Sequence, residues 1–178
     1  MADVSAQSSV LRPMAAEDLD LLLPLQREAA QVAFADVFPQ DLFPFPTEVV
    51  RQRWQAELAD PGIECFVVVD ADGGTAGFAA VKGHQFLHFG TALHSWGSGL
   101  AGAAHAEILD RWITHGYARG WLRVLEQNER ARRFYERRGW EPTGVSERSG
   151  FAPYPVLLTY EIDLTADGRG KRAGCGVR

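Results

Sequence analysis

The sequence has little cysteine and shows no cysteine pattern of structural use. Its 178 residues include only two cysteines, Cys65 and Cys175, which are too few for a disulfide framework. Cys65 lies in the apolar run IECFVVV and is predicted to be a small buried hydrophobic residue, whereas Cys175 lies in a Gly/Arg/Lys tail and is predicted to be exposed. Neither cysteine has the spacing to a histidine that zinc sites show, so we expect no metal site.

Long hydrophobic runs are also missing. No apolar stretch of the sequence approaches the roughly 18–20 residues that a membrane-spanning helix needs. The N-terminal residues MADVSAQSSVLRP lack the basic and then apolar segments of a signal peptide. We therefore expect a cytoplasmic protein with no membrane partner.

Positive net charge is absent as well. The formal net charge of −5 at pH 7 argues against nucleic acid as a partner, because contact with phosphate backbones requires a positive surface. Basic residues are nevertheless concentrated within residues 129–138, where the arginines are Arg130, Arg132, Arg133, Arg137 and Arg138. A solvated helix face and a landing site for an anionic ligand both explain this concentration.

What is present predicts an α/β fold, with a mixed sheet flanked by helices. Strands are predicted at residues 9–12, 63–71, 75–81, 86–93, 121–125, 140–149 and 156–164. Helices are predicted at residues 16–33, 47–59, from 96 to about 119, and around 131–135. We expect Pro24 to kink or break the first helix and Thr47 to cap the second. The order β-α-α-β-β-β-α-β-α-β-β indicates a single domain over residues 9–164, between disordered residues 1–8 and a flexible tail at 165–178.

A glycine-rich segment, WGSGLA at residues 96–101, separates a predicted strand from a predicted helix. Glycine lets the backbone approach a ligand closely, and the first amides of a helix have no partners within the helix. These amides also carry the positive end of the helix dipole, so the segment can bind a pyrophosphate through main chain alone. A turn that merely connects the two elements explains the glycines equally well.

The same glycines fit a dinucleotide-binding pattern. Gly97, Gly99 and Gly102 match G-x-G-x-x-G, and Glu126 after the next strand could serve as the ribose-binding acid. That fold needs several more strand-helix units after the glycines, and here only one helix and a hairpin remain. The three predicted strands before the turn are also foreign to it, so we reject this interpretation.

A second motif follows the turn. Residues 124–140, VLEQNERARRFYERRGW, closely resemble the N-x-x-A-x-x-F-Y-E-x-x-G-F segment of the GNAT superfamily of acetyl-CoA-dependent N-acetyltransferases. The turn resembles that superfamily's Q/R-x-x-G-x-G/A signature, with Trp96, Gly99 and Ala101 in the defining places. The opening LRPM at residues 11–14 and EDL at 17–19 is similar to the usual start of the family. The resemblance covers about residues 9–164 and is weakest over 30–60.

The resemblance implies a GNAT-like fold, acetyl-CoA as co-substrate and a role for each matching residue. Backbone amides of about residues 97–101 would hold the CoA pyrophosphate, and the edge of the strand ending near Leu93 would pair with the pantetheine arm at a splay beside strand 121–125. Asn128 would bind the pantetheine region, and Tyr135 would protonate the leaving thiolate. The cofactor-binding residues implied are Thr91, Leu93, Trp96, Gly97, Ser98, Gly99, Leu100, Ala101, Asn128, Arg132 and Tyr135.

Catalysis requires a proton acceptor and a proton donor. Tyrosine suits the donor because its pKa of about 10 is close enough to that of a thiol to share a proton, although Tyr135 also fits a core stripe with Ala131 and Phe134. The acceptor is less defined, because Gln85 occupies the place where many family members have a glutamate. Glu126, two residues before Asn128 and on the same face of an extended segment, is our candidate base.

Other proton acceptors remain open. His84, His88 and His94 lie on or beside the central strand, with His84 and His88 at the same parity, but surface or half-buried histidines are the simpler interpretation of all three. Water could also serve. Arg132 and Arg133 are candidates for the CoA 3′-phosphate, and Trp96 replaces the usual Gln or Arg of the turn signature.

The acceptor substrate is expected to be a small-molecule or peptide amine bound by residues 30–60. This region has the aromatic residues Phe34, Phe38, Phe43, Phe45 and Trp54 and the acidic residues Asp36, Asp41 and Glu48. Simple packing of the first helices on the sheet explains the aromatic residues as well. A rival hypothesis is a non-catalytic acyl-CoA-binding or ligand-sensing module of the same fold, and family analogy alone suggests a possible homodimer.

Overall fold

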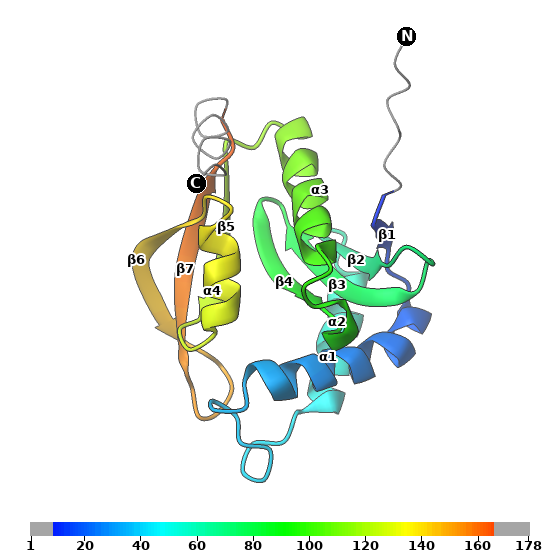
Figure 1. Cartoon of the computed structure of the whole chain (residues 1–178), viewed down its shortest axis with the longest axis vertical. Helices are drawn as coiled ribbons and strands as arrows, with labels where there is room; N and C mark the ends of the chain where they lie inside the picture. Colours follow the sequence, from blue (N-terminus) through cyan, green and yellow to red (C-terminus); the bar gives the residue numbers. More distant parts are fainter. Residues whose placement is uncertain (1–8, 166–178) are drawn as a thin grey trace.

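A computed structural model describes residues 9–165, arranged around one seven-stranded sheet in the order β1-β2-β3-β4-β5-β7-β6 (Figure 1). The strands are β1 Leu11–Pro13, β2 Ile63–Val69, β3 Thr75–Lys82, β4 Gln85–Thr91, β5 Arg119–Leu125, β6 Glu141–Arg148 and β7 Val156–Asp163. The helices are α1 Leu19–Ala33, α2 Thr47–Ala59, α3 Leu100–Thr114 and α4 Glu129–Glu136, with 3₁₀ turns η1 Ala16–Asp18 and η2 Leu93–Ser95. The mixed α/β fold and the predicted order of elements are confirmed. The expectations for residues 1–8, for 166–178 and for Cys175 lie outside the described residues.

Two local expectations need correction, because Pro24 does not break its helix and Thr47 is not a cap. Helix α1 continues through Pro24, whose ring is exposed while Leu22 and Leu23 hold the helix on the sheet. Packing of this face outweighs the one backbone hydrogen bond that proline removes. At α2 the N-cap is Pro46, so Thr47 is the first helical residue and caps nothing with its side chain.

The core forms two clusters, one on each face of the sheet. Strand β2 shows the division, because Phe66 packs beneath α3 while Cys65 and Val67 pack beneath α1 and α2. This alternation follows from successive side chains of a strand pointing to opposite faces. Cys65 is buried as predicted, and burial raises the pKa of its thiol to about 11. Helices α3 and α4 thus lie on one face of the sheet and α1 and α2 on the other.

Strands β4 and β5 pair over a very short distance. Their parallel pairing joins Gln85 to Trp121 and Phe86 to Leu122, and within residues 9–165 no later residue of β4 pairs with β5. On its other side, β4 contains a bulge, because Val81 pairs with Phe86 while the adjacent Ala80 pairs with His88. A bulge bends its strand. The two strands therefore diverge from Phe86 onward, as Figure 1 shows and as the family resemblance implies.

Candidate active site

The glycine turn leads from β4 into the first turn of α3. Gly97 has φ of +80° and Gly99 φ of +90°, in the left-handed region that side chains disfavour. Ser98 stabilises the turn from within: its hydroxyl donates to the Ser95 carbonyl at 2.7 Å and accepts the Leu100 N–H at 3.2 Å. A side chain on Gly97 or Gly99 would meet nothing within 4 Å. Backbone conformation, and not crowding, is therefore what requires glycine here.

Several main-chain donors of this turn have no acceptor among residues 9–165. The first helical hydrogen bond of α3 runs from Ala103 N–H to the Gly99 carbonyl, at 3.1 Å. In the described part of the chain, nothing accepts the N–H groups of Gly97, Gly99, Ala101 and Gly102. Free amides at the positive end of a 15-residue helix form a site for an anion.

Two arginines from the α4 region reach this turn. The Arg130 guanidinium lies 3.5 Å from the centroid of the Trp96 ring, and Trp96 donates its indole N–H to the Thr91 carbonyl at 3.0 Å. A Cβ atom built on Gly102 would come within 2.6 Å of Arg138 Nη2, so that guanidinium lies against the first turn of α3. Burial lowers the pKa of Arg130. It also lowers the pKa of Arg138, and the nearby charge of Arg137 adds a smaller effect in the same direction. Among residues 9–165, neither arginine has a carboxylate partner within ion-pair distance.

The arginines that we selected from the sequence, Arg132 and Arg133, contact other groups of the protein. Arg132 donates from Nε to the Tyr160 hydroxyl at 3.2 Å and from Nη1 to the Glu126 carbonyl at 3.1 Å, so it links α4 to β7. Arg133 pairs with Glu129 one turn earlier in the same helix, at 2.8 Å. Both guanidinium groups thus have partners within the protein, and their contact with the CoA 3′-phosphate stays a prediction. Helical spacing alone could not distinguish these arginines from Arg130.

Tyr135 combines a core ring with an available hydroxyl. Its side chain is buried, and its ring centroid lies 5.3 Å from that of Phe134 and 5.8 Å from that of Trp140. Burial raises the pKa of Tyr135 far above its usual value, so the hydroxyl keeps its proton at neutral pH. Within residues 9–165 this hydroxyl has no hydrogen-bond partner. The core and the proton-donor interpretations are therefore compatible.

The segment between β5 and α4 differs from the expected extended chain. Glu126 and Gln127 form a turn, closed by a 2.9 Å bond from Asn128 N–H to the Leu125 carbonyl. The same-face argument for Glu126 is therefore wrong, because side-chain alternation applies only to extended backbone; the Glu126 side chain is exposed. Asn128 is the N-cap of α4, where its Oδ1 accepts the Ala131 N–H at 3.1 Å. Its amide nitrogen remains available as a donor.

The end of β4 also differs from the prediction. The strand ends at Thr91, whose carbonyl accepts the Trp96 indole N–H. Leu93 begins η2 and is not part of the strand, because the chain must turn before it enters α3. Only residues 87–91 therefore form the edge of β4 that faces the diverging strand β5.

The histidines of this region have different environments. His84 Nδ1 contacts the Arg119 carbonyl at 2.7 Å at the paired end of β4, next to Gln85, and His94 is exposed. His88 lies in the divergent part, where its Nε2 is 2.7 Å from Oε1 of Glu57 on α2. The bulge interrupts the alternation of side chains along β4, so the even spacing of His84 and His88 does not place them on the same face of the sheet.

The His88–Glu57 pair lies on the face of the sheet covered by α2. The ring centroid of His88 is 5.1 Å from that of Trp54. The second carboxylate oxygen of Glu57, Oε2, is buried and has no hydrogen-bond partner among the described residues. Cys65 pairs with Ala80 and Ala80 pairs with His88, so these three residues form one row across β2, β3 and β4. The next strand beyond His88 is β5, which diverges from β4 here. His88 is among the histidines that the sequence leaves open as a base, whereas Glu57 is distant along the chain and no sequence pattern links it to His88.

Residues 30–60 divide between packing and exposure. Trp54 is buried, with its indole N–H donated to Gln26 at 2.9 Å, and Phe45 packs on the same cluster. For these two, core packing is the correct interpretation. Asp36, Asp41 and Glu48 are exposed. The guanidinium of Arg53 on α2 lies 4.7 Å from the centroid of Phe151, which connects α2 to the loop between β6 and β7.

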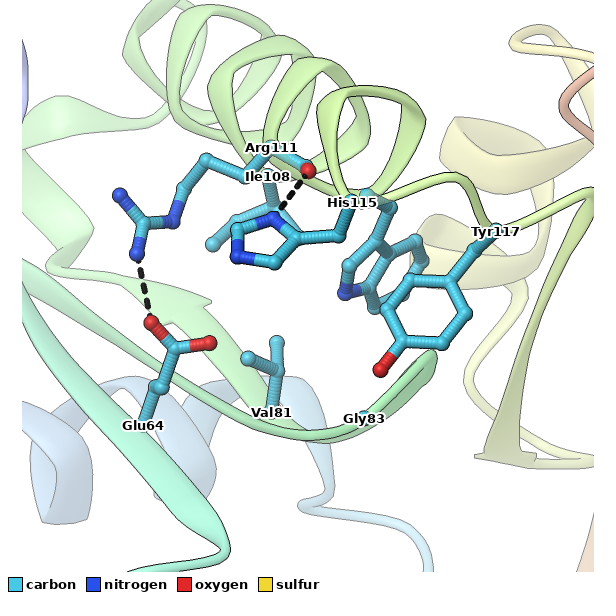
Figure 2. Close-up of a pocket in the computed structure, with 8 residues that line it drawn as sticks. Glu64, Val81, Gly83, Ile108, Arg111, His115 and Tyr117 are labelled. Atoms are coloured by element: carbon cyan, nitrogen blue, oxygen red, sulfur yellow. Dashed lines mark hydrogen bonds and ion pairs between the residues drawn. The ribbon is translucent and has the colours of Figure 1, made fainter.

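A separate pocket lies near the other end of α3 (Figure 2). It is lined by Glu64, Val81, Gly83, Ile108, Arg111, Trp112, His115 and Tyr117, with a volume of about 40 Å³. Arg111 pairs with Glu64 at 2.5 Å, and the His115 ring contacts the Arg111 carbonyl at 2.7 Å (Figure 2). This volume holds only a few water molecules. None of the residues selected from the sequence lines it.

Across residues 9–165, no three His, Cys, Asp or Glu side chains are grouped so that they could hold a metal ion. The helices in this range are all too short or too polar to span a bilayer.

Comparison with known proteins identifies related folds. Residues 9–141 match the family model described as acetyltransferase (GNAT) domain. Spermidine N-acetyltransferase from Vibrio cholerae, solved with CoA and spermine, is 19% identical with a TM-score of 0.66 over 86% of this chain and 94% of that one. A GCN5-related N-acetyltransferase from Rhodopseudomonas palustris is 14% identical, with a TM-score of 0.70 over 91% and 99% of the two chains. No curated protein sequence matches the chain significantly.

Proposed function

This chain belongs to the GNAT family of acetyltransferases, and from that premise we propose that it transfers an acetyl group from acetyl-CoA to a primary amine. The acceptor is a small molecule or a peptide, and the amine attacks the thioester directly while both substrates are bound. The observation that carries the proposal is the set of four unpartnered amides, from Gly97 to Gly102, beside the unpaired edge of β4.

The residues present fit a CoA molecule. The four free amides and the positive end of α3 suit a pyrophosphate, and the left-handed glycines leave the space in front of them open. The unpaired edge of β4 offers backbone groups to the amides of the pantetheine arm, and the free amide nitrogen of Asn128 offers one more donor. Bound acetyl-CoA supplies the activated acetyl group.

We assign the proton donor to Tyr135. As the amine nitrogen bonds to the thioester carbon and the carbon–sulfur bond breaks, the Tyr135 hydroxyl gives its proton to the departing sulfur. Burial keeps this hydroxyl protonated beforehand, and no protein acceptor within residues 9–165 competes for it. A thiolate that forms in the same water-poor site is desolvated as well, which raises its affinity for a proton and lets it take the proton of Tyr135.

The attacking amine must also lose a proton. His88 is the better-supported acceptor, because Glu57 orients its ring and the pair lies where β4 diverges from β5. A histidine oriented by a carboxylate is a recurring arrangement for a base. Glu126 remains the alternative, as an exposed carboxylate near Asn128.

The amine acceptor is supported by charge and by comparison. The protein carries a formal net charge of −5, and Asp36, Asp41 and Glu48 are exposed between α1 and the start of α2. Such carboxylates raise the local concentration of a cationic amine. Among the similar solved structures, spermidine N-acetyltransferases act on an amine of a small cationic molecule.

Calorimetric titration with acetyl-CoA tests the first half of the proposal, and release of free thiol in the presence of a panel of amines tests the second. We expect binding, followed by thiol release with at least one small or peptide amine. Binding without thiol release from any amine would favour a non-catalytic acyl-CoA-binding module. Absence of binding would contradict both functions.

A further inference from the structure

We propose that Arg130 of α4 contacts the pyrophosphate of CoA and that the ring of Trp96 holds its guanidinium in place. The inference rests on the proposed function, because it assumes that CoA binds at the glycine turn. It assigns a side-chain cation to a site where the turn itself supplies only backbone amides.

The turn has no cation of its own. Its first position, where the resembling signature has Gln or Arg, is Trp96 in this chain. The indole has a single N–H, and that group is donated to the Thr91 carbonyl. Trp96 therefore has no donor left for a phosphate. What it offers is a ring face, and Arg130 occupies that face at 3.5 Å.

A stacked guanidinium keeps its N–H groups available. Stacking uses the flat face of the group, whereas its five N–H donors point outward in the plane and match phosphate oxygens in pairs. Trp96 directly precedes Gly97, the first of the free amides. The Trp96 platform thus holds a cation beside the donors that would bind the pyrophosphate.

The state of the neighbouring arginines makes Arg130 distinct. Arg132 is bonded to Tyr160, and Arg133 is paired with Glu129. Arg138 donates to the Phe134 carbonyl at 3.2 Å and lies over the Phe134 ring at 3.8 Å. Arg130 contacts only a ring, with neither a carboxylate nor a carbonyl partner among residues 9–165. The Arg130 side chain is exposed and has no counter-charge among residues 9–165, so its N–H donors are available to an anionic ligand.

The test compares three ligands that differ in phosphate content. CoA has the pyrophosphate and the 3′-phosphate, dephospho-CoA has the pyrophosphate alone, and pantetheine has neither. Dissociation constants are measured by calorimetry for the wild type, Arg130→Ala and Arg137→Ala. Arg137→Ala is the matched control, since it removes the same charge at the other end of the same helix, where the Arg137 side chain is exposed.

We expect Arg130→Ala to weaken CoA and dephospho-CoA about ten-fold each and to leave pantetheine unchanged. Arg137→Ala should bind all three ligands like the wild type. An equal loss for pantetheine would overturn the inference, because the variant would then have damaged the whole site. A loss for CoA but not for dephospho-CoA would also overturn it, by moving the contact to the 3′-phosphate.

Trp96 variants test the platform. Trp96→Phe keeps a ring and should retain most of the CoA affinity, whereas Trp96→Ala should lose about as much as Arg130→Ala, and the two alanine effects should not add. Additive losses would contradict the platform role. If wild-type protein fails to bind CoA at all, the proposed function itself fails; if it binds CoA and Arg130→Ala binds equally well, only this inference fails.

Discussion

The indole N–H of Trp140 donates a 2.9 Å hydrogen bond to Nε2 of His105 in the buried core. His105 lies in α3, one turn after the glycine turn, and Trp140 is the residue just before β6. The His105 ring also lies parallel to Phe86 of β4, with centroids 6.0 Å apart. The bond therefore fixes the start of α3 to the chain that leaves α4. Since these two helices carry Gly102 and Arg130, it also holds the two sides of the candidate cofactor site together.

Replacing His105 should destabilise the fold. His105→Leu leaves the Trp140 N–H buried without an acceptor, and we expect a loss of about 1–3 kcal/mol in the free energy of unfolding. Urea denaturation measures this change, with His94→Leu as the control because His94 is exposed. Equal stability of the two variants would show that water replaces the lost acceptor.

Gly99 should not tolerate a side chain. Its φ of +90° is outside the region that alanine prefers, so Gly99→Ala should cost about 1–2 kcal/mol or force the turn to rearrange. A rearranged turn would misdirect the free amides, and acetyl-CoA affinity should fall. Gly150→Ala is the control, because a Cβ atom there meets nothing within 4 Å and needs no left-handed backbone. Unchanged affinity in Gly99→Ala would exclude these amides as the pyrophosphate site.

Tyr135→Phe should lower turnover by about ten-fold or more with little change in acetyl-CoA affinity. Phenylalanine retains the buried ring packing against Phe134 and Trp140, so the fold should survive. Steady-state kinetics and calorimetry together separate the two effects. Because the pKa of Tyr135 is raised by burial, loss of its proton should not appear in the pH–rate profile near neutrality. Wild-type turnover in this variant would remove the acid role.

The proton acceptor can be identified from pH–rate profiles of kcat/KM. We expect His88→Gln to abolish the acidic limb of the profile and Glu57→Gln to weaken it, since the variant amide orients the ring less strongly than the carboxylate at 2.7 Å. Glu126→Gln should behave like the wild type. The reverse pattern, with Glu126→Gln alone changing the limb, would return the role to Glu126.

Asp18 should make stability depend on pH. Two hydrogen bonds from Arg12, at 2.7 and 2.8 Å, and one from the Ala15 N–H lower the pKa of the Asp18 carboxyl below its ordinary value. A carboxyl whose folded pKa is depressed stabilises the fold above its unfolded pKa of about 3.9, and this contribution disappears as pH falls through the folded value.

Asp18→Asn should therefore cost about 1 kcal/mol near neutrality, a modest value because Arg12 is partly exposed. Chemical denaturation at several pH values measures the difference from wild type. It should shrink steadily as the solution is acidified below about pH 4. A constant difference would mean that the ion pair contributes nothing to the pH dependence.

Local sequence patterns predicted much of this structure. Element order, the burial of Cys65 and the turn at residues 96–101 follow from periodicity, glycine placement and motif spacing. The early stop of β4 at Thr91 and the turn at Glu126 could not be predicted in this way. Both depend on hydrogen bonds to groups, such as the Trp96 indole, whose positions are set only after the chain has folded.

Side-chain partners were the hardest to predict. Five arginines lie within ten residues, and all have similar helix propensity and charge. Three of them differ through their partners, which are Trp96, Tyr160 and Glu129. Two of these partners are distant in sequence. The pairing of His88 with Glu57 likewise needs α2 to pack over β4, and a bulge moves His88 out of simple alternation.

The short pairing between β4 and β5 divides the sheet into two parts that can open separately. With only two paired positions there, the sheet consists of two hydrogen-bonded units, β1 to β4 and β5-β7-β6, joined chiefly by α3 and α4 through contacts such as Trp140 with His105. Amide hydrogens of the second unit can therefore exchange through partial openings that leave the first intact. A ligand held between the units contacts both and suppresses such openings by its binding energy. If acetyl-CoA binds as we propose, we therefore expect it to slow amide exchange in both units, because the ligand would take the place of the missing strand pairing.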